Sequence, residues 1–385
     1  MTQHLRAWYA HRQGLDGSLE GASAATVLET AGWARSVAGA SPYLTLFSRA
    51  GITREAADAA VKACEIHELP AVRNCTYVLP ASDFALGLRA GRSFWAAGEM
   101  RTAIGLGVTE KEIDKLCDAV VKALARTREP MDPDAIRTAV GTAARSLGEE
   151  GKKKGLTTTL PLALGKLQTY GEIRRVPVNG RLDQQRYLYT IWGLPKAVEA
   201  CEEDVAIELA RRYFQWIGPA SIAEFQWFSG LGVKAAKSAV ASLGLVAFDD
   251  IKWMFAQDRD ALAAFRVPKE PCYKLVGSLD SISLLRRDLP GLLGEAAAAT
   301  AILKGALTEL PSHAILDRGE LVGLWEFDLE ANELVWASFV PKNRALEKAV
   351  ADTEAFVREQ LGDARSFSLD SPKSRGPRID RLRVK

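Results

Sequence analysis

The stretch from Gly218 to Phe255 constrains the fold more than any other part of the sequence. After Gly218-Pro219, the run Ser221-Ile-Ala-Glu224 has the spacing of a capping box, in which two side chains bind free backbone amides where a helix begins. Gly230-Leu231-Gly232 ends this helix, and apolar residues at helical spacing indicate a second one. Strand-forming residues then continue to the end of the stretch. The pattern predicts a winged helix-turn-helix unit over residues 196–262.

Two earlier segments have the same order of helices followed by a hairpin. In residues 96–195, helical residues are followed by two strand-forming runs that flank Asn179-Gly180, the strongest short signal for a hairpin turn. In residues 1–95 the order is fainter, with helix caps expected at Ser23 and Thr53 and strand-like residues up to Leu79. The chain is therefore predicted to be an α+β protein with three tandem winged helix-turn-helix units.

Beyond about residue 263 the pattern changes from helical to strand-like. Runs of strand-forming residues are separated by tight turns such as Arg318-Gly319, and a helical run extends from Asn343 to Leu361. We expect a C-terminal β-barrel-like domain with helices over residues 263–370. Residues 371–385 form a basic tail that contains proline and glycine, and we expect this tail to be extended or disordered.

Composition narrows the possible locations and partners of the protein. No apolar run approaches the roughly 20 residues that a membrane span requires, and five scattered cysteines suit free thiols in a reducing compartment. We therefore expect a cytoplasmic, nucleoid-associated monomer. Cys64, His67 and Cys75 approach the spacing of metal ligands, but no fourth ligand lies nearby, so neither a metal nor another cofactor is expected.

Net charge alone does not indicate a nucleic-acid partner. The formal net charge is +2, and the tail from Pro372 contributes +5, which leaves −3 on the first 371 residues. Local clusters are more informative, because winged helices place one helix in a DNA groove and the hairpin on the backbone. Basic residues of the second and third units are thus candidate DNA contacts, namely Arg174, Arg175, Arg181, Lys234 and Lys237. Ordinary solvated surface charge is the alternative for each of them.

Four stretches of the sequence resemble the AlkZ and YcaQ family of bacterial DNA glycosylases. The most specific is Arg212-Tyr-Phe-Gln-Trp-Ile-Gly-Pro-Ala-Ser-Ile-Ala-Glu-Phe-Gln-Trp-Phe-Ser-Gly-Leu231. The others are Val72-Arg-Asn-Cys-Thr-Tyr-Val-Leu-Pro-Ala-Ser-Asp83, Gly277-Ser-Leu-Asp280 and Asp317-Arg-Gly-Glu-Leu-Val-Gly-Leu-Trp325. The resemblance extends from about residue 20 to 340.

The resemblance implies both an activity and site residues. It implies three winged helices with a C-terminal barrel, and removal of alkylated purines, including interstrand crosslinks, from damaged double-stranded DNA. Arg73 and Thr76 of the stretch that resembles the family's Arg-x-x-Thr strand are candidate DNA contacts, and so is Arg49 in the aromatic-Ser-Arg helix end Phe47-Ser48-Arg49. The barrel strand supplies Asp280 as a candidate catalytic carboxylate.

The sequence departs from the family where the catalytic Gln-x-Gln or Gln-hydrophobic-Asp motif is expected. That window reads Gly32-Trp-Ala-Arg-Ser-Val-Ala38, and no Gln, Asp or Glu lies between Glu29 and Glu55. Trp33 is a candidate for stacking on a base and Arg35 for holding a phosphate, and the alternative is a core tryptophan with a surface arginine.

Two hypotheses follow from this departure. In the first, the chain is a divergent glycosylase whose water is managed by Glu29, His67, Asp83 or Asp280. In the second, it is a winged-helix DNA-binding or regulatory protein without catalysis.

Overall fold

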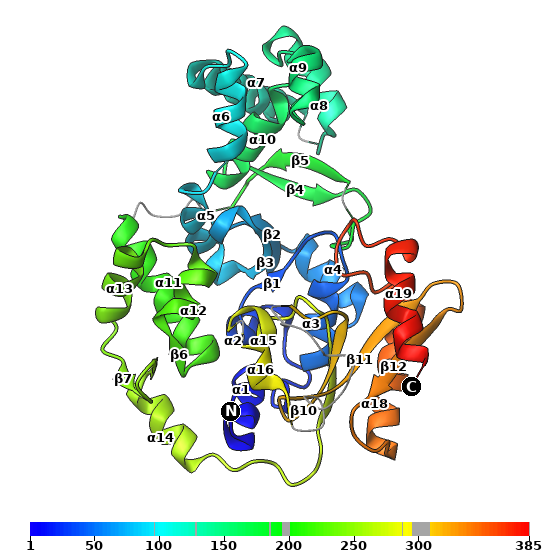
Figure 1. The fold of residues 1–385 in the computed structure, drawn as a ribbon. Coiled ribbons are helices and arrows are strands. Elements are labelled where there is room, and N and C mark those ends of the chain that lie inside the picture. The colour runs from blue at the N-terminus through cyan, green and yellow to red at the C-terminus, as the bar shows by residue number, and fades with distance from the viewer. Residues whose placement is uncertain are drawn as a thin grey trace.

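A computed structural model describes residues 1–95, 97–127, 129–184, 186–194, 201–286, 288–294 and 309–384, and Figure 1 shows their arrangement. The first segment combines helices with a small antiparallel sheet of strand order β1-β3-β2. Its elements are α1 (Gln3–Arg12), α2 (Ala24–Ala31), β1 (Ala34–Arg35), α3 (Ser41–Ala50), α4 (Arg54–Lys62), β2 (Ile66–Pro70), β3 (Thr76–Pro80) and α5 (Phe84–Arg92). The expected caps are present, because the Ser23 and Thr53 hydroxyls accept from backbone amides at the starts of α2 and α4.

The second segment, at the top of Figure 1, is helical and ends in a hairpin. Its own hydrophobic core joins α7, α10 and the hairpin strands. The Asn179-Gly180 turn was predicted correctly, since it lies between β4 and β5, and Gly180 has the positive φ of 76° that the turn requires. The elements are α6 (Ala97–Gly105), α7 (Glu110–Thr127), α8 (Pro133–Val140), α9 (Gly148–Lys153), α10 (Leu160–Thr169), β4 (Ile173–Pro177) and β5 (Tyr187–Ile191).

The third segment contains the helix pair and hairpin expected from the sequence. Ser221 and Glu224 form both hydrogen bonds of the capping box, and Gly230 ends α12 in the left-handed conformation. The predicted boundary at residue 195 lies outside the described residues. The elements are α11 (Glu202–Ile217), β6 (Ala220–Ser221), α12 (Ile222–Ser229), α13 (Val233–Ala241), β7 (Val246–Ala247), β8 (Lys252–Met254) and α14 (Ala256–Ala264).

The C-terminal part contains an open sheet rather than the expected barrel. Its four antiparallel strands have the order β12-β11-β10-β9, and no pairing between β9 and β12 closes the sheet within the described residues. Helices α3 and α18 pack against β9, and α19 packs against β11 and β12. The elements are β9 (Tyr273–Val276), α15 (Ser281–Leu284), α16 (Leu289–Leu292), β10 (His313–Asp317), β11 (Glu320–Asp328), β12 (Glu333–Ser338), α18 (Arg344–Phe356) and α19 (Pro372–Arg383).

The basic tail is a packed helix, which corrects the expectation of an extended or disordered segment. Helix α19 buries Ile379 and Leu382, and its arginines meet carboxylates of the sheet and the preceding loop. Arg375 is 1% exposed and bonds Asp363 at 2.7 Å. Carboxylates therefore neutralise Arg375 and Arg378 within the fold, while Lys373, Arg381 and Arg383 remain exposed.

Helix α1 contacts residues that lie far from it in the sequence, at the end of α11 and just before β6. Its Trp8 indole donates to the Gly218 carbonyl at 2.9 Å, and its Tyr9 hydroxyl donates to the next carbonyl at 2.5 Å. Just beyond the helix, the Gln13 amide donates to the Trp216 carbonyl at 2.9 Å. One hydrophobic core consequently joins α1, the first hairpin, α11 to α13 and part of the C-terminal sheet. Among the described residues, no helix has the length and apolar character needed to cross a bilayer.

Candidate functional site

The motif window contains β1, and Trp33 just before this strand and Arg35 within it occupy different environments. Trp33 is 2% exposed, its indole N–H donates to Asp83 Oδ2 at 2.9 Å, and its ring contacts those of Trp216 and Phe228. No face of the indole is open to a nucleic-acid base. This corrects the expected stacking role, and Trp33 is the core tryptophan of the alternative interpretation.

Arg49 and Asp280 form an ion pair in the interior. Arg49 is fully buried and Asp280 is 1% exposed, and two guanidinium nitrogens of Arg49 donate to the two carboxylate oxygens at 2.8 Å each. Asp280 also accepts from the Ile282 amide where α15 begins. The expected DNA contact of Arg49 and catalytic role of Asp280 are therefore corrected, because each side chain is the enclosed counterion of the other.

The other proposed water-managing groups are dispersed. The Glu29 carboxylate is exposed and accepts from the Ser82 hydroxyl at 2.7 Å. Asp83 is buried between Trp33 and Arg212, and burial raises the pKa of its carboxyl despite both partners. His67 lies among aromatic rings, and burial lowers the pKa of its imidazole to about 4, with Arg174 acting in the same direction. Of these groups, Glu29 and Asp83 come near enough for the charge of Glu29 to add to the rise in the Asp83 pKa, and His67 lies apart from them on β2.

Arg35 and Arg73, here called the arginine pair, each lie against an aromatic ring, Arg35 on Tyr77 of β3 and Arg73 on Trp227 of α12. Arg35 donates to the Thr76 carbonyl at 2.8 Å, and its guanidinium lies 5.2 Å from the centre of the Tyr77 ring. Arg73 is in the first-hairpin turn with a positive φ of 58°, and its guanidinium lies 4.2 Å from the centre of the Trp227 ring. Burial raises the pKa of Tyr77 to about 12, while both arginines oppose this shift. Two permanent cations thus lie against two different aromatic rings where the first and third segments meet.

A hollow of about 500 Å³, the hairpin hollow, separates the first hairpin from the second segment. Thr76 and Arg175, two of the residues expected at DNA, line it together. Polar and charged residues complete the wall, including Asn74, Arg137 and Gln168 and the two acids Glu99 and Asp134. The donors around this open hollow suit contacts to a phosphodiester backbone, which position DNA without reading its sequence.

The remaining basic candidates differ in how exposed and how strongly paired their side chains are. Lys234 and Lys237 are exposed on α13, as expected from the sequence. Arg174 is half-buried on β4, and its charge is felt by His67. Arg181 is bound by the Asp183 carboxylate and donates to the Leu361 carbonyl at 2.8 Å. The expected DNA role of Arg181 is corrected, because its guanidinium is held by these internal acceptors.

Comparison with known proteins places this arrangement in a family. A model of the family described as DNA glycosylase AlkZ-like matches residues 31–365. The chain belongs to the AlkZ-like DNA glycosylase family. Among solved structures it resembles the Streptomyces sahachiroi DNA glycosylase AlkZ, with a TM-score of 0.71 and 20% sequence identity over 95% of this chain and 98% of that one. A search of curated protein sequences gives no match.

Glu68 is a buried acid near the motif window of this AlkZ-like chain that sequence reasoning missed. It is 5% exposed on β2, and one carboxylate oxygen accepts from the Ser36 hydroxyl at 2.6 Å and from the Tyr187 hydroxyl at 3.4 Å. Burial raises the pKa of the Glu68 carboxyl, and Arg175 opposes the shift. Glu68 therefore joins the window to the second hairpin. The available signal was an acidic residue inside an otherwise strand-forming run, which indicates a buried polar partner.

Proposed function

We propose that this AlkZ-like protein is a DNA-repair N-glycosylase that removes alkylated purines, including those of interstrand crosslinks, from double-stranded DNA. The observation that carries the proposal is the arginine pair. Arg35 comes from the motif window of the family and lies on the Tyr77 ring, and Arg73 of the first hairpin is near enough for its charge to act on the same tyrosine. Two cations beside the window suit the phosphates that flank a lesion, since guanidinium groups bind phosphate oxygens in a fork geometry.

The proposal also assigns the surfaces of the protein that hold the DNA duplex. The segments 1–95, 96–195 and 196–262 act as three winged helices of a monomer that works on the nucleoid in the cytoplasm. The exposed lysines Lys234 and Lys237 contact the backbone from α13, and the hairpin hollow receives a second stretch of backbone beside Arg175. Backbone contacts of this kind supply affinity and make it depend on salt.

The chemistry suits a site without a strong general acid. An N7-alkylated purine carries a positive charge, so it leaves C1′ of the sugar as a neutral base when the glycosidic electron pair moves to N9. Water adds to C1′ and loses a proton to solvent or to a nearby carboxylate. The protein must mainly stabilise the cationic sugar and position the water. Arg35 cannot take that proton, because a guanidinium stays protonated.

Excision of N7-methylguanine from duplex DNA tests the activity directly. We expect alkali-sensitive abasic sites to accumulate with the wild-type protein, and Arg35→Ala and Arg73→Ala each to weaken retention of the duplex. Arg344→Ala, an exposed arginine on α18, is the matched control. Intact DNA under saturating, folded protein would contradict the glycosylase proposal.

The departure of the window from the family motif favours a second candidate function, DNA binding without catalysis. No Gln, Asp or Glu lies between Glu29 and Glu55. Under this alternative, duplex is retained with an affinity that falls steeply with salt, and the glycosidic bond stays intact. An affinity that is flat between low and moderate salt would contradict phosphate binding and thus both candidates.

A further inference from the structure

A small pocket lies beside the arginine pair on the side of the third segment. Its volume is about 130 Å³. We call it the Trp227 pocket, and the wall residues that matter here are Trp227, Ser278, Ser283, Glu309, Ser366 and Phe367. Leucine side chains form much of the remaining wall. A space of this size, with flat aromatic and apolar walls and a few hydroxyls, suits one heteroaromatic ring.

The pocket adjoins the motif window through its loop of residues 363–371. The Ser368 amide donates to the Val37 carbonyl at 3.1 Å, and the Arg365 side chain donates to the Ala38 carbonyl at 3.0 Å. On the opposite wall, Trp227 lies under the guanidinium of Arg73. The pocket is thus bounded by the segment that carries the family motif on one side and by a member of the arginine pair on the other.

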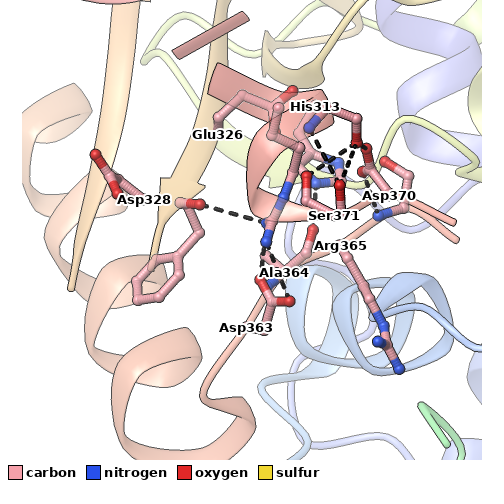
Figure 2. A network of polar contacts seen from close by, with 12 residues as sticks. His313, Glu326, Asp328, Asp363, Ala364, Arg365, Asp370 and Ser371 are labelled. Atoms are coloured by element: carbon pink, nitrogen blue, oxygen red, sulfur yellow. Dashed lines mark hydrogen bonds and ion pairs between the residues drawn. The ribbon is translucent and has the colours of Figure 1, made fainter. Parts of the chain in front are cut away.

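A polar network holds the pocket wall in place, as Figure 2 shows around His313 and Asp370. His313 accepts from the Ser278 amide at 2.9 Å and donates to the Ala364 carbonyl at 2.6 Å. Burial lowers the pKa of this imidazole, which agrees with the neutral form that these two bonds require. Asp370 accepts from the Ser366 amide at 3.2 Å and from Arg378. The wall is therefore preformed, and a ligand would not have to order it.

The exposed aromatic ring in this loop indicates what the pocket binds. Phe367 is 41% exposed, and no ring–ring contact to it is present among the described residues. Single exposed apolar side chains are common, but a large ring in a pocket wall offers a flat surface on which every base can stack favourably. A planar base in the pocket would cover the Phe367 ring.

The charges on the wall favour a cationic base over a neutral one. Glu309 supplies the one carboxylate among the described wall residues. Arg378 also reaches the wall, but it is bound by Asp370 at 2.7 Å and lies 2.9 Å from Glu326. Two carboxylates thus compensate the Arg378 guanidinium. Arg73 lies against Trp227 but is not part of the wall, and Glu309 is the carboxylate within the wall that is left to attract a positive ligand. An N7-alkylated purine is such a ligand, whereas an undamaged purine is neutral.

We infer that the Trp227 pocket receives an extruded alkylpurine that is not joined to the opposite strand, with Phe367 stacking on the ring and Glu309 selecting its positive charge. The inference rests on the proposed function for the identity of its ligand. It assigns Phe367 and Glu309 to recognition of the base, and no chemical step is required of either. Selectivity for damaged bases then comes from the attraction between the Glu309 carboxylate and the positive charge that alkylation creates.

Binding of a free nucleoside tests the pocket separately from catalysis. The probes are 7-methylguanosine, which carries the positive charge, and guanosine, which does not, each titrated into the full chain by calorimetry. We expect 7-methylguanosine to bind at least tenfold more tightly than guanosine. Phe367→Ala should weaken its binding at least tenfold, Phe367→Tyr should preserve it, and Leu369→Ala, which truncates an 83% exposed side chain in the same loop, is the matched control. Glu309→Gln should bring the two nucleosides to within about threefold of each other.

The outcomes separate this inference from the proposed function. Equal binding by Phe367→Ala and Leu369→Ala, or no measurable binding of 7-methylguanosine, overturns the pocket assignment even if the protein excises N7-methylguanine from DNA. Selective binding of 7-methylguanosine that depends on Phe367 supports the assignment even if excision is absent, and in that case the glycosylase proposal alone fails. Circular dichroism of each variant verifies that its fold is intact.

Discussion

The buried ion pair of Arg49 and Asp280 gives the most direct test of the structure. Asp280→Asn removes the negative charge but keeps an oxygen that can still cap α15. Arg49 then loses one of its two 2.8 Å carboxylate bonds and its counterion, while its 2.7 Å bond to the Gln13 carbonyl remains. Breaking one side of a buried pair typically costs 3–5 kcal/mol. Because the carbonyl contact persists, we expect a loss of about 3 kcal/mol in the free energy of unfolding.

Urea unfolding followed by tryptophan fluorescence measures this loss as a shift of the midpoint. The matched control is Asp352→Asn, which breaks an exposed ion pair with Lys348 and should cost no more than about 1 kcal/mol. Retention of duplex DNA per folded molecule should be unchanged in Asp280→Asn, since Arg49 is enclosed. Equal losses in the two variants would refute the assignment of Arg49 and Asp280 to the interior.

Three further predictions follow from burial and charge. Trp33→Ala should cost about 3–5 kcal/mol of unfolding free energy, and a loss below about 1 kcal/mol would contradict the 2% exposure of the indole. The free energy of unfolding should fall as the pH drops from 6.5 toward 4, because His67 binds a proton in the unfolded chain but stays neutral in the folded protein. The loss is about 3 kcal/mol at 1.36 kcal/mol per pKa unit. If His67→Phe shows the same pH dependence as the wild type, His67 is not its cause. Replacing Lys234 and Lys237 together by alanine should reduce the salt slope of DNA affinity by about 2 without changing the melting temperature, and an unchanged slope would remove α13 from the interface.

Features set by neighbouring residues could be predicted from the sequence. The capping box of Ser221 and Glu224 and the turn at Asn179-Gly180 depend on bonds that span three or four residues, so the local pattern contains all the information. The same holds for the three hairpins, whose order relative to the helices follows from periodicity. The family resemblance is equally local, because it rests on short continuous stretches.

The environments of the proposed site residues could not be predicted, because their partners lie far away in the sequence. Arg49 and Asp280 are separated by 231 positions, and neither residue carries a sign of burial in its own surroundings. Trp33 reaches Asp83 only after β1 has paired with β3. A charged or aromatic side chain at a motif position can therefore be exposed or buried, and only the tertiary fold determines which.

The carboxylates that fix the C-terminal helix were missed for a related reason. Composition shows the six basic groups after Pro372 but not which acids face them. Arg375 pairs with Asp363, and Arg378 pairs with Asp370 and lies near Glu326 on β11. Once these acids supply counterions, a segment with the composition of a disordered tail gains enough from burial of Ile379 and Leu382 to remain helical.

The contacts of α1 with Gly218, Pro219 and Trp216 limit how such a protein can be recombined. A chain built as a row of independent units tolerates the exchange of one unit for a homologous one, because only short linkers have to match. Here α1 completes the interior of the third segment, which lies some 200 residues later in the chain. A chimera joined between the first and second segments, or between the second and third, therefore needs α1 and the third segment from the same parent. In natural hybrid proteins of this kind, we expect α1 and the third segment to come from the same parent.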